Sequence, residues 1–401
     1  MRTFKALPFL LSAALLMPFF LATGASAEAP VTFSFTGSGY GHGVGMSQIG
    51  AKARALSGES ATAILNYYYK DVQVAPIVDT QTIRVNIGRA QKTISFVSPT
   101  PDSMIQIFSG DIAGAQDISP ILTLGAKTKI TFNVDGALAV AEGLRAKAFT
   151  IRWSGGPATV ITFSQPGSAV KYKYGQIQVK VVKGAMEVTN TLAIRDEYLW
   201  GISEVPSSWP AAALEAQVIA SRSYALSKLG KINSACDCQV YSHIADQNFV
   251  GFSKESEPRF GHLWKAAVTR TNIDTTTSLA ILANGKPIQA YFFSSSGGAT
   301  QTTLDAWGQA TSYTQSVLDP AGLDPKNNPR FATWSASADQ ALIAKAFLLA
   351  DIVTLEIMSR NTAGAVTYIK GTASDGSTKL LRGDTFRSRV KIPSPYFNLA
   401  G

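Results

Sequence analysis

Short β-forming segments dominate the chain between about residues 80 and 185. Four of them alternate or cluster β-formers between Gly, Pro and Ser breaks, at residues 83–87, 129–134, 148–153 and 176–182. No internal repeat of fixed period and no low-complexity linker separates this stretch from the rest of the chain. The pattern predicts a strand-rich region that packs against its neighbours.

The clearest helix is expected to begin at Ser207 or Ser208 and to end before Gly230. A serine N-cap, Pro210 in the first turn and a glycine beyond the end are the usual start and stop signals. Arg222 lies near the middle of the apolar arc of this helix, where a charge is costly unless it is paired. We therefore expect a fixed partner for Arg222, unless the arc is a partly wetted groove with Arg222 at its edge.

Composition narrows the class of protein. The chain has 401 residues, of which 46% are hydrophobic and 16% charged, and this excludes a disordered chain. Two cysteines and three histidines leave no room for a disulfide-dense scaffold, a zinc array or an HExxH site. Strands together with helices predict an α+β fold.

The N-terminus has the organisation of a secretory signal peptide. Two basic residues precede an apolar run from Ala6 to about Ala22, and Gly24-Ala25-Ser26-Ala27 supplies small residues for cleavage. The alternative is an uncleaved membrane anchor. We expect residues 1–27 to be removed and the protein to be secreted, extracytoplasmic and peripheral to the membrane at most. A scattered net charge of +9 suits an anionic wall polymer or membrane surface, and no nucleic-acid partner is expected for an exported chain.

Glu204 is the candidate acid. It precedes the helix, and Pro206 pushes Val205 out of the α region. A carboxyl group among Trp200, Trp209 and Val205 can be desolvated and keep its proton near neutral pH, as a general acid must. The alternative is a capping acid beside the helix dipole, which favours the charged form.

Four blocks of sequence resemble the SpoIID/LytB family of cell-wall proteins, which includes a peptidoglycan lytic transglycosylase. Within residues 192–226 the matching positions are Glu197-Tyr198-Leu199, Glu204, Pro206, Trp209-Pro210, Ala216-Gln217, Arg222 and Tyr224-Ala225. The further blocks are Cys238-Gln239-Val240-Tyr241, Ala290–Gly298 and Gly41–Gln48. The last of these, the GHG block, follows the others in the family but precedes them here. This order predicts a circular rearrangement of one fold, or else a separate add-on module.

The resemblance implies an organisation and a chemistry. The expected parts are a signal peptide (1–27), a GHG-motif segment packing onto the core (28–75), an inserted or additional β-rich region (76–185) and a SpoIID-like catalytic core (186–401). Glu204 would protonate the glycosidic oxygen of peptidoglycan, and the C6 hydroxyl of the substrate would then close on C1. Conventional glycosidases use two carboxylates instead, and the second acid would then be Asp196, Glu197 or Glu215. A third function is a non-catalytic, peptidoglycan-binding enhancer of a partner amidase.

The expected substrate contacts each have a structural alternative. Arg222 and Tyr224 either orient sugar groups or Glu204, or form a buried ion pair and pack. Ser294 and Ser296 either bind sugar or cap a turn, and no G-x-S-x-G order supports a serine nucleophile. In the GHG block, His42 either lines the glycan groove with exposed backbone or bonds a turn that closes the sheet, and Gln48 is a further candidate contact.

The cysteines form the last candidate site. Some family members resemble zinc proteins here, with a histidine directly before the second cysteine, but this chain has Asp237 at that place. Only His243 is close enough in sequence to add a ligand, and a tetrahedral zinc site needs more. We expect a Cys236–Cys238 disulfide, no metal and no cofactor.

Overall fold

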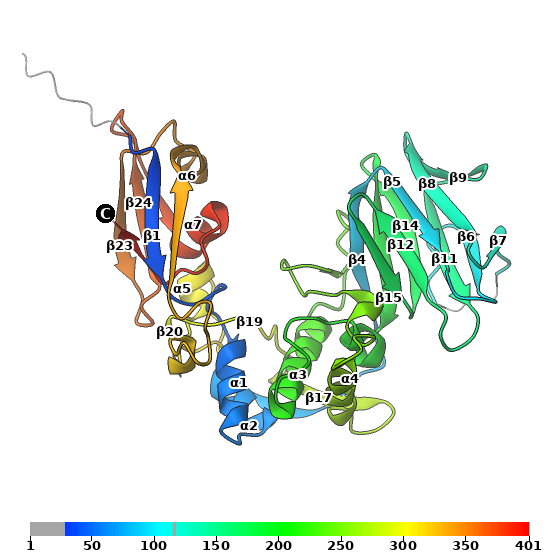
Figure 1. Ribbon diagram of the computed structural model, residues 1–401, viewed down its shortest axis with the longest axis horizontal. Helices are drawn as coiled ribbons and strands as arrows, with labels where there is room; N and C mark the ends of the chain where they lie inside the picture. Colours follow the sequence, from blue (N-terminus) through cyan, green and yellow to red (C-terminus); the bar gives the residue numbers. More distant parts are fainter. Residues whose placement is uncertain (1–28, 115–117, 401) are drawn as a thin grey trace, which may run out of the picture.

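The computed structural model describes residues 29–114 and 118–400 and confirms the α+β class. The predicted signal peptide lies outside the described residues. Figure 1 shows a β-rich lobe, a smaller lobe that contains the C-terminal strands, and a group of helices between them. Within the described ranges, no helix combines the length and the apolar character that crossing a bilayer requires.

The β-rich lobe consists of two packed sheets. The seven-stranded sheet has the order β16 (Val240–Tyr241), β4 (Thr82–Gln91), β15 (Ala185–Ala193), β14 (Gln176–Val182), β11 (Ala148–Ser154), β6 (Met104–Ser109) and β7 (Leu122–Gly125). The six-stranded sheet has the order β10 (Leu144–Ala146), β9 (Leu138–Ala141), β8 (Lys129–Asp135), β5 (Thr93–Val97), β12 (Ile161–Gln165) and β13 (Ser168–Tyr172). Phe132 and Phe149 meet between the sheets with ring centroids 5.3 Å apart. The four strand segments predicted from sequence all lie in these sheets.

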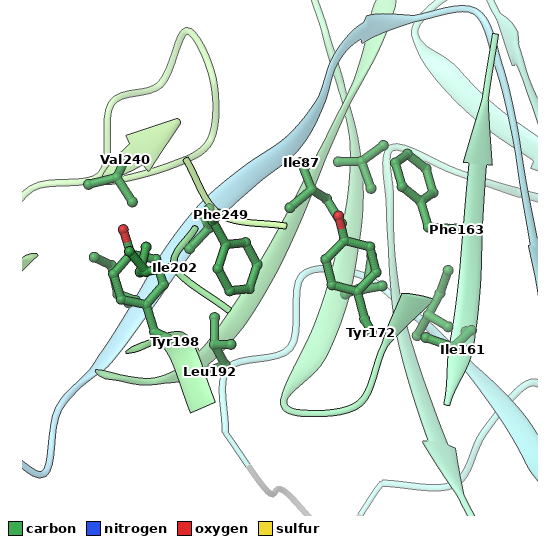
Figure 2. Packing of buried hydrophobic residues seen from close by; sticks show 14 of the residues in the cluster. Ile87, Ile161, Phe163, Tyr172, Leu192, Tyr198, Ile202, Val240 and Phe249 are labelled. Carbon is green, nitrogen blue, oxygen red and sulfur yellow. The ribbon is translucent and has the colours of Figure 1, made fainter. Parts of the chain in front are cut away.

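The hydrophobic core of this lobe continues into the helical part. Figure 2 shows Phe163 and Tyr172 of the sheets lying beside Phe249 and Tyr198, and the rings of Tyr198 and Phe249 stack at 5.3 Å. Strand β16 also comes from the helical part and pairs in parallel with β4. One apolar cluster therefore spans both regions, as expected for regions without a linker.

Helix α3 (Ala211–Ser227) is packed on several sides. It contacts α1 (Gln48–Leu56), α2 (Ala61–Tyr68) and α4 (Gly261–Arg270), and the small Ala216 and Ala220 belong to the cluster shared with α1 and α2. The predicted serine N-cap is wrong. Residues 206–209 form a turn, closed by the Trp209 N–H donating to the Pro206 carbonyl, and Pro210 occupies the cap position without a side-chain bond.

The N-terminal strand completes a sheet of the C-terminal lobe. Strand β1 (Thr32–Gly37) lies between β22 (Trp334–Asp339) and β26 (Phe397–Ala400) and is antiparallel to both. Phe35 of β1 packs between Phe386 and Phe397. The same lobe holds α6 (Gln340–Phe347), α7 (Gly383–Val390) and a sheet of β23 (Thr354–Arg360), β24 (Val366–Thr372) and β25 (Thr378–Arg382).

The remaining elements connect the lobes. They are β2 (Met46–Ser47) with β19 (Phe292–Phe293), β3 (Gln73–Val78) with β17 (Thr277–Ala283) and β18 (Lys286–Pro287), β20 (Gly298–Ala299) with β21 (Leu318–Asp319), α5 (Thr303–Trp307), and the short turns η1 (Ile194–Tyr198), η2 (Gly251–Ser253) and η3 (Pro320–Gly322). Two expected region boundaries fall inside strands: position 75/76 cuts β3, and position 185/186 cuts β15. Both strands are held by partners distant in sequence. The circular rearrangement stays a prediction.

Candidate functional site

Glu204 lies in the segment between η1 and α3, with its side chain half-buried. Its Oε1 accepts a hydrogen bond of 2.7 Å from the backbone N–H of Asn248. Burial raises the pKa of Glu204, while the Asn248 N–H and the charge of Lys254 act in the opposite direction. Because burial is the largest effect, the pKa of Glu204 lies above its ordinary value, which is the direction that a general acid needs.

Lys254 holds the backbone next to this acid. Its side chain is buried, and its Nζ donates to the carbonyl of Val205 at 2.6 Å. The ammonium lies 4.9 Å from the ring centroid of Trp264, whose Nε1 donates to the carbonyl of Leu199. Burial lowers the pKa of Lys254 to about 8, although Glu257 and Glu204 raise it. Lys254 and Trp264 therefore hold the segment that carries Glu204 at the main-chain carbonyls of Val205 and Leu199. The Lys254 ammonium also acts electrostatically on the Glu204 carboxyl.

Gln48 of the GHG block reaches the same segment. Its Nε2 lies 3.4 Å from the main-chain carbonyl oxygen of Glu204 and 3.2 Å from Oε1 of Gln217. Residues 41–48 and the Glu204 motif therefore meet in space, although they are far apart in sequence. The Gln48 side chain is buried, so it supports the backbone of Glu204 rather than presenting its amide to a ligand.

His42 lies in an aromatic setting beside this contact. Its ring centroid is 5.2 Å from that of Trp307, 5.6 Å from Phe293 and 6.4 Å from Tyr291. Nδ1 accepts a bond from the Val44 N–H, as the turn-bonding alternative requires. Burial lowers the pKa of His42 to about 4, so the ring is neutral at neutral pH.

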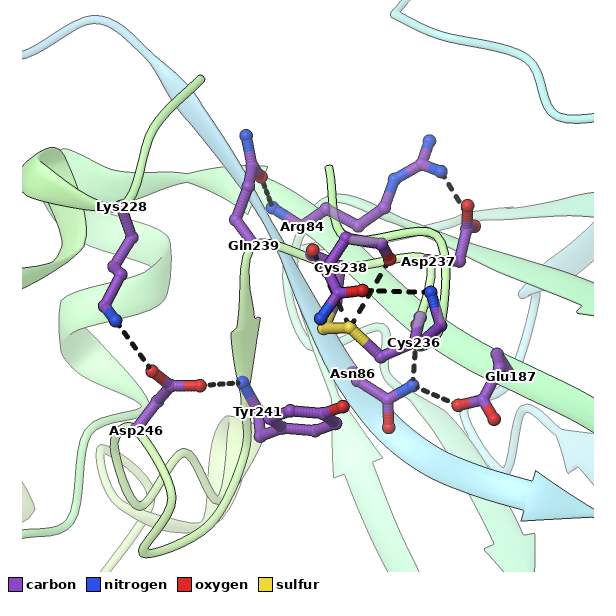
Figure 3. Close-up of a disulfide and its surroundings, with 12 residues drawn as sticks. Arg84, Asn86, Glu187, Lys228, Cys236, Asp237, Cys238, Gln239, Tyr241 and Asp246 are labelled. Carbon is purple, nitrogen blue, oxygen red and sulfur yellow. Dashed lines mark hydrogen bonds and ion pairs between the residues drawn. A yellow bond between two sulfur atoms is a disulfide. The ribbon is translucent and has the colours of Figure 1, made fainter. Parts of the chain in front are cut away.

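Tyr224 of α3 contacts both Tyr291, beside His42, and Asp246, in the segment after β16. Its ring is 6.4 Å from that of Tyr291, which also contacts His42, and its hydroxyl donates to Oδ1 of Asp246 at 2.6 Å. Asp246 also accepts from the backbone N–H of Tyr241 and lies 3.6 Å from the ammonium of Lys228 (Figure 3). Tyr224 and His42 therefore both contact Tyr291, while Gln48 contacts the main chain of Glu204, and the Tyr224 side chain is buried.

Arg222 and Ser296 do not face a ligand, and their expected roles as substrate contacts are corrected here. Arg222 is 0% exposed and pairs with Asp79 at 2.8 Å, which is the fixed partner expected for it. Ser296 is also fully buried and donates to Oδ2 of Asp319 at 2.6 Å. Ser294 is half-buried, and its carbonyl accepts from the N–H of Ile49 at the start of α1.

The three possible second acids each have a structural partner. Asp196 accepts from Nδ2 of Asn272, Glu197 accepts from the N–H of Ala193, and Glu215 pairs with Arg270. Glu204 also lies apart from three surface hollows, two in the β-rich lobe and one beside Trp334 and Tyr396. Burial raises the pKa of both Glu197 and Glu204, but Glu197 lies at η1 and bonds the N–H of Ala193, whereas Glu204 lies in the segment that Gln48 and Lys254 contact.

Cys236 and Cys238 form a disulfide, the pairing favoured over a zinc site (Figure 3). Asp237 stands between them, and its carboxylate binds Arg84 at 2.9 Å and Lys180 at 2.7 Å. An ion-pair network therefore occupies the position where some family members have a histidine. Within residues 29–114 and 118–400, no group of three or more His, Cys, Asp or Glu side chains is arranged to hold a metal ion.

Comparison with known proteins identifies relatives of the region that carries these residues. Residues 182–277, which include Glu204, Arg222 and Asp237, match the family model described as SpoIID, Stage II sporulation protein. Stage II sporulation protein D of Bacillus subtilis (strain 168) is 24% identical over 226 residues, covering 54% of this chain and 62% of that protein. The protein of the same name from Bacillus amyloliquefaciens is 27% identical, covering 58% of this chain and 67% of that protein.

A second kind of relative carries a different name. The amidase enhancer of Bacillus subtilis (strain 168) is 60% identical over 111 residues, which is 28% of this chain and 13% of that protein. No solved structure matches the chain. The matches span only part of each relative, and the strongest identity is confined to a short region. The domain at residues 182–277 matches the SpoIID family, and the relatives named stage II sporulation protein D and amidase enhancer support its assignment to the SpoIID/LytB family.

Proposed function

We propose that this protein acts on the cell wall by cleaving peptidoglycan glycan strands, with Glu204 as the general acid. The observation that carries the proposal is the half-buried Glu204 carboxyl, whose pKa is raised by burial. It lies where the GHG block and the SpoIID-type motif meet through Gln48. Membership of the SpoIID/LytB family supports a cell-wall-related role.

The proposed reaction needs one carboxyl group and no water. Glu204 donates its proton to the glycosidic oxygen, the bond from that oxygen to C1 breaks, and the released sugar leaves as an alcohol. The resulting carboxylate takes the proton of the C6 hydroxyl as that oxygen bonds to C1. The product has a 1,6-anhydro end, and Glu204 regains its proton. The neutral, half-buried His42 ring is our candidate for orienting a sugar hydroxyl group, whereas Tyr224 is buried and its hydroxyl is bonded to Asp246.

A second candidate is a non-catalytic enhancer of a wall amidase. The stretch that is 60% identical to a protein named amidase enhancer favours it. A protein that only binds the wall does not require a carboxyl group of raised pKa at position 204. The two functions therefore differ in what Glu204→Gln should do.

The test incubates purified sacculi with the protein and identifies the released sugars by mass spectrometry. We expect anhydro-ended fragments from the wild type and none from Glu204→Gln, with wall binding retained. Glu215→Gln is the matched control, because Glu215 is also a half-buried carboxylate of this domain but is paired with Arg270. Full release by Glu204→Gln would exclude the assigned acid. Release of reducing ends would indicate a two-carboxylate hydrolase, and release only when an amidase is added would indicate the enhancer.

A further inference from the structure

Positive charge is concentrated in the β-rich lobe rather than scattered, contrary to the expectation from the sequence. Residues 82–193 contain twelve basic and six acidic side chains, whereas the rest of the chain from residue 29 contains 22 and 20. The lobe therefore supplies most of the net charge. Concentrated charge of one sign creates a local potential that attracts polyanions.

Lysines gather at one end of the seven-stranded sheet. The end of β4, the start of β11 and the turn between β14 and β15 meet there, since Met186 pairs with Gln91 and Ala148 with Lys180. A surface hollow of about 370 Å³ is lined at this end by Lys147, Lys180 and Lys183, with Val181 and Val182 among its apolar walls. We call it the lysine hollow.

The lysines of the hollow differ in how their charge is used. The ammonium of Lys180 pairs with Asp237 at 2.7 Å and with Asp111 at 3.5 Å. Lys147 and Lys183 are exposed, and neither forms an ion pair within residues 29–114 and 118–400. Lys92 donates from the rim to the carbonyl of Gly184 at 2.6 Å, which leaves its charge uncompensated.

Nearby acidic groups do not neutralise these three charges. Glu187 accepts from the neutral Asn86 amide and Ala90 N–H and forms no ion pair with Lys92, Lys147 or Lys183 within the described residues, and Asp135 pairs with Arg145. Asp111 and Asp237 form ion pairs with Arg84 and Lys180. Lys92, Lys147 and Lys183 are therefore left as cations around a hollow with apolar walls.

We propose that the lysine hollow binds a phosphodiester polymer of the cell wall, with its phosphates on Lys92, Lys147 and Lys183. Ammonium groups bind phosphate as point charges and need no fixed planar geometry, so three flexible lysines suit a chain of repeating phosphates. The apolar walls suit the carbon units between successive phosphates. The proposal rests on the proposed wall location of the protein but not on the chemistry of Glu204.

The test measures binding of the full-length protein to purified poly(glycerol phosphate) teichoic acid across a series of salt concentrations. We expect affinity to fall as salt rises, because binding releases counterions from the polymer. The variant K147E/K183E should bind at least about tenfold more weakly, and its salt dependence should be shallower by about two phosphate contacts. K127E/K129E is the matched control, since it changes the net charge equally at exposed positions at the opposite end of the lobe, where Lys129 pairs with Val97.

Two further variants and two further ligands separate binding at the lysine hollow from effects of net charge, misfolding or a different anionic partner. K147Q/K183Q should also bind weakly with an unchanged melting temperature, and Glu204→Gln should bind as the wild type does. Equal loss in K127E/K129E and K147E/K183E would overturn the site, because the effect would then be one of net charge. Binding to phosphatidylglycerol vesicles or to inorganic phosphate with no binding to the polymer would overturn the proposed partner. A wild-type result for Glu204→Gln in the sacculus assay would remove the cleavage proposal and leave this one standing.

Discussion

Replacing Arg222 by Met tests whether this side chain is structural or touches substrate. The substitution deletes the ion pair with Asp79 and the hydrogen bonds that the guanidinium donates to Thr271, Leu279 and Asn272. Both charged side chains of the pair are 0% exposed, so Asp79 is left buried without its ion-pair partner. Removing one member of a buried pair costs about 3–5 kcal/mol in the free energy of unfolding.

The loss should also depend on pH. Burial raises the pKa of Asp79, and Arg222 counteracts that effect. Without the guanidinium, the pKa of Asp79 in the folded state rises further above its unfolded value. Stability is then retained below the unfolded pKa and is lost as pH increases through the folded pKa. The destabilisation of Arg222→Met should therefore be larger at pH 8 than at pH 5.

Urea denaturation at the two pH values, followed by tryptophan fluorescence, measures both effects. The double variant D79N/R222M removes both charges and should recover part of the lost stability. A loss below about 1 kcal/mol would refute the reasoning, because it lies far under the cost of breaking a buried pair. So would a variant that keeps its stability but loses wall binding, since Arg222 would then have to contact the glycan.

Two further substitutions test the surroundings of the acid. Lys254→Met removes the cation near Glu204, so the pKa of Glu204 should rise and the high-pH limb of the cleavage profile should move to higher pH. Lys254→Arg keeps the charge and should keep the wild-type profile. An unmoved limb in Lys254→Met would show that this charge does not act on the acid. Gly45→Ala places a Cβ 2.1 Å from the Tyr291 carbonyl oxygen at φ +78°, so calorimetry should show that the free energy of unfolding falls by more than about 2 kcal/mol. Gly58 has φ +89° but open space around it, so Gly58→Ala should lower the free energy of unfolding by only about 1 kcal/mol. Equal melting temperatures of the two glycine variants would contradict the close contact.

The local sequence patterns predict which helices and strands form better than they predict the residues at which these elements begin and end. The segments in β4, β8, β11 and β14 carry β-formers at the right spacing, and these strands form as expected. Helix α3 starts later than its serines predict, because Ser207 and Ser208 lie within the turn closed by Trp209 and Pro206, and Pro210 occupies the cap position. Strand β3 was missed because its partner β17 lies far along the chain.

The candidate site could be predicted only in part for the same reason. The apolar flanks of Glu204 indicated desolvation, and the motif blocks indicated which segments belong together. Asn248 and Lys254 carry no local signal, because they reach Glu204 and Val205 only when the segment after β16 folds back. Lys254 could not be singled out from the sequence, because Glu255, Glu257 and Arg259 follow it in the same polar stretch.

The position of β1 has a consequence for how the Glu204 backbone is supported. The strand leads directly into the segment with His42 and Gln48, but its two neighbours in the sheet, β22 and β26, lie about 300 residues or more further along the chain. Such long-range pairing is slow to form and late in a folding sequence. The pairing of β1 therefore couples the segment that contains His42 and Gln48 to the C-terminal lobe, so loosening of that lobe is expected to loosen the support of the Glu204 backbone as well.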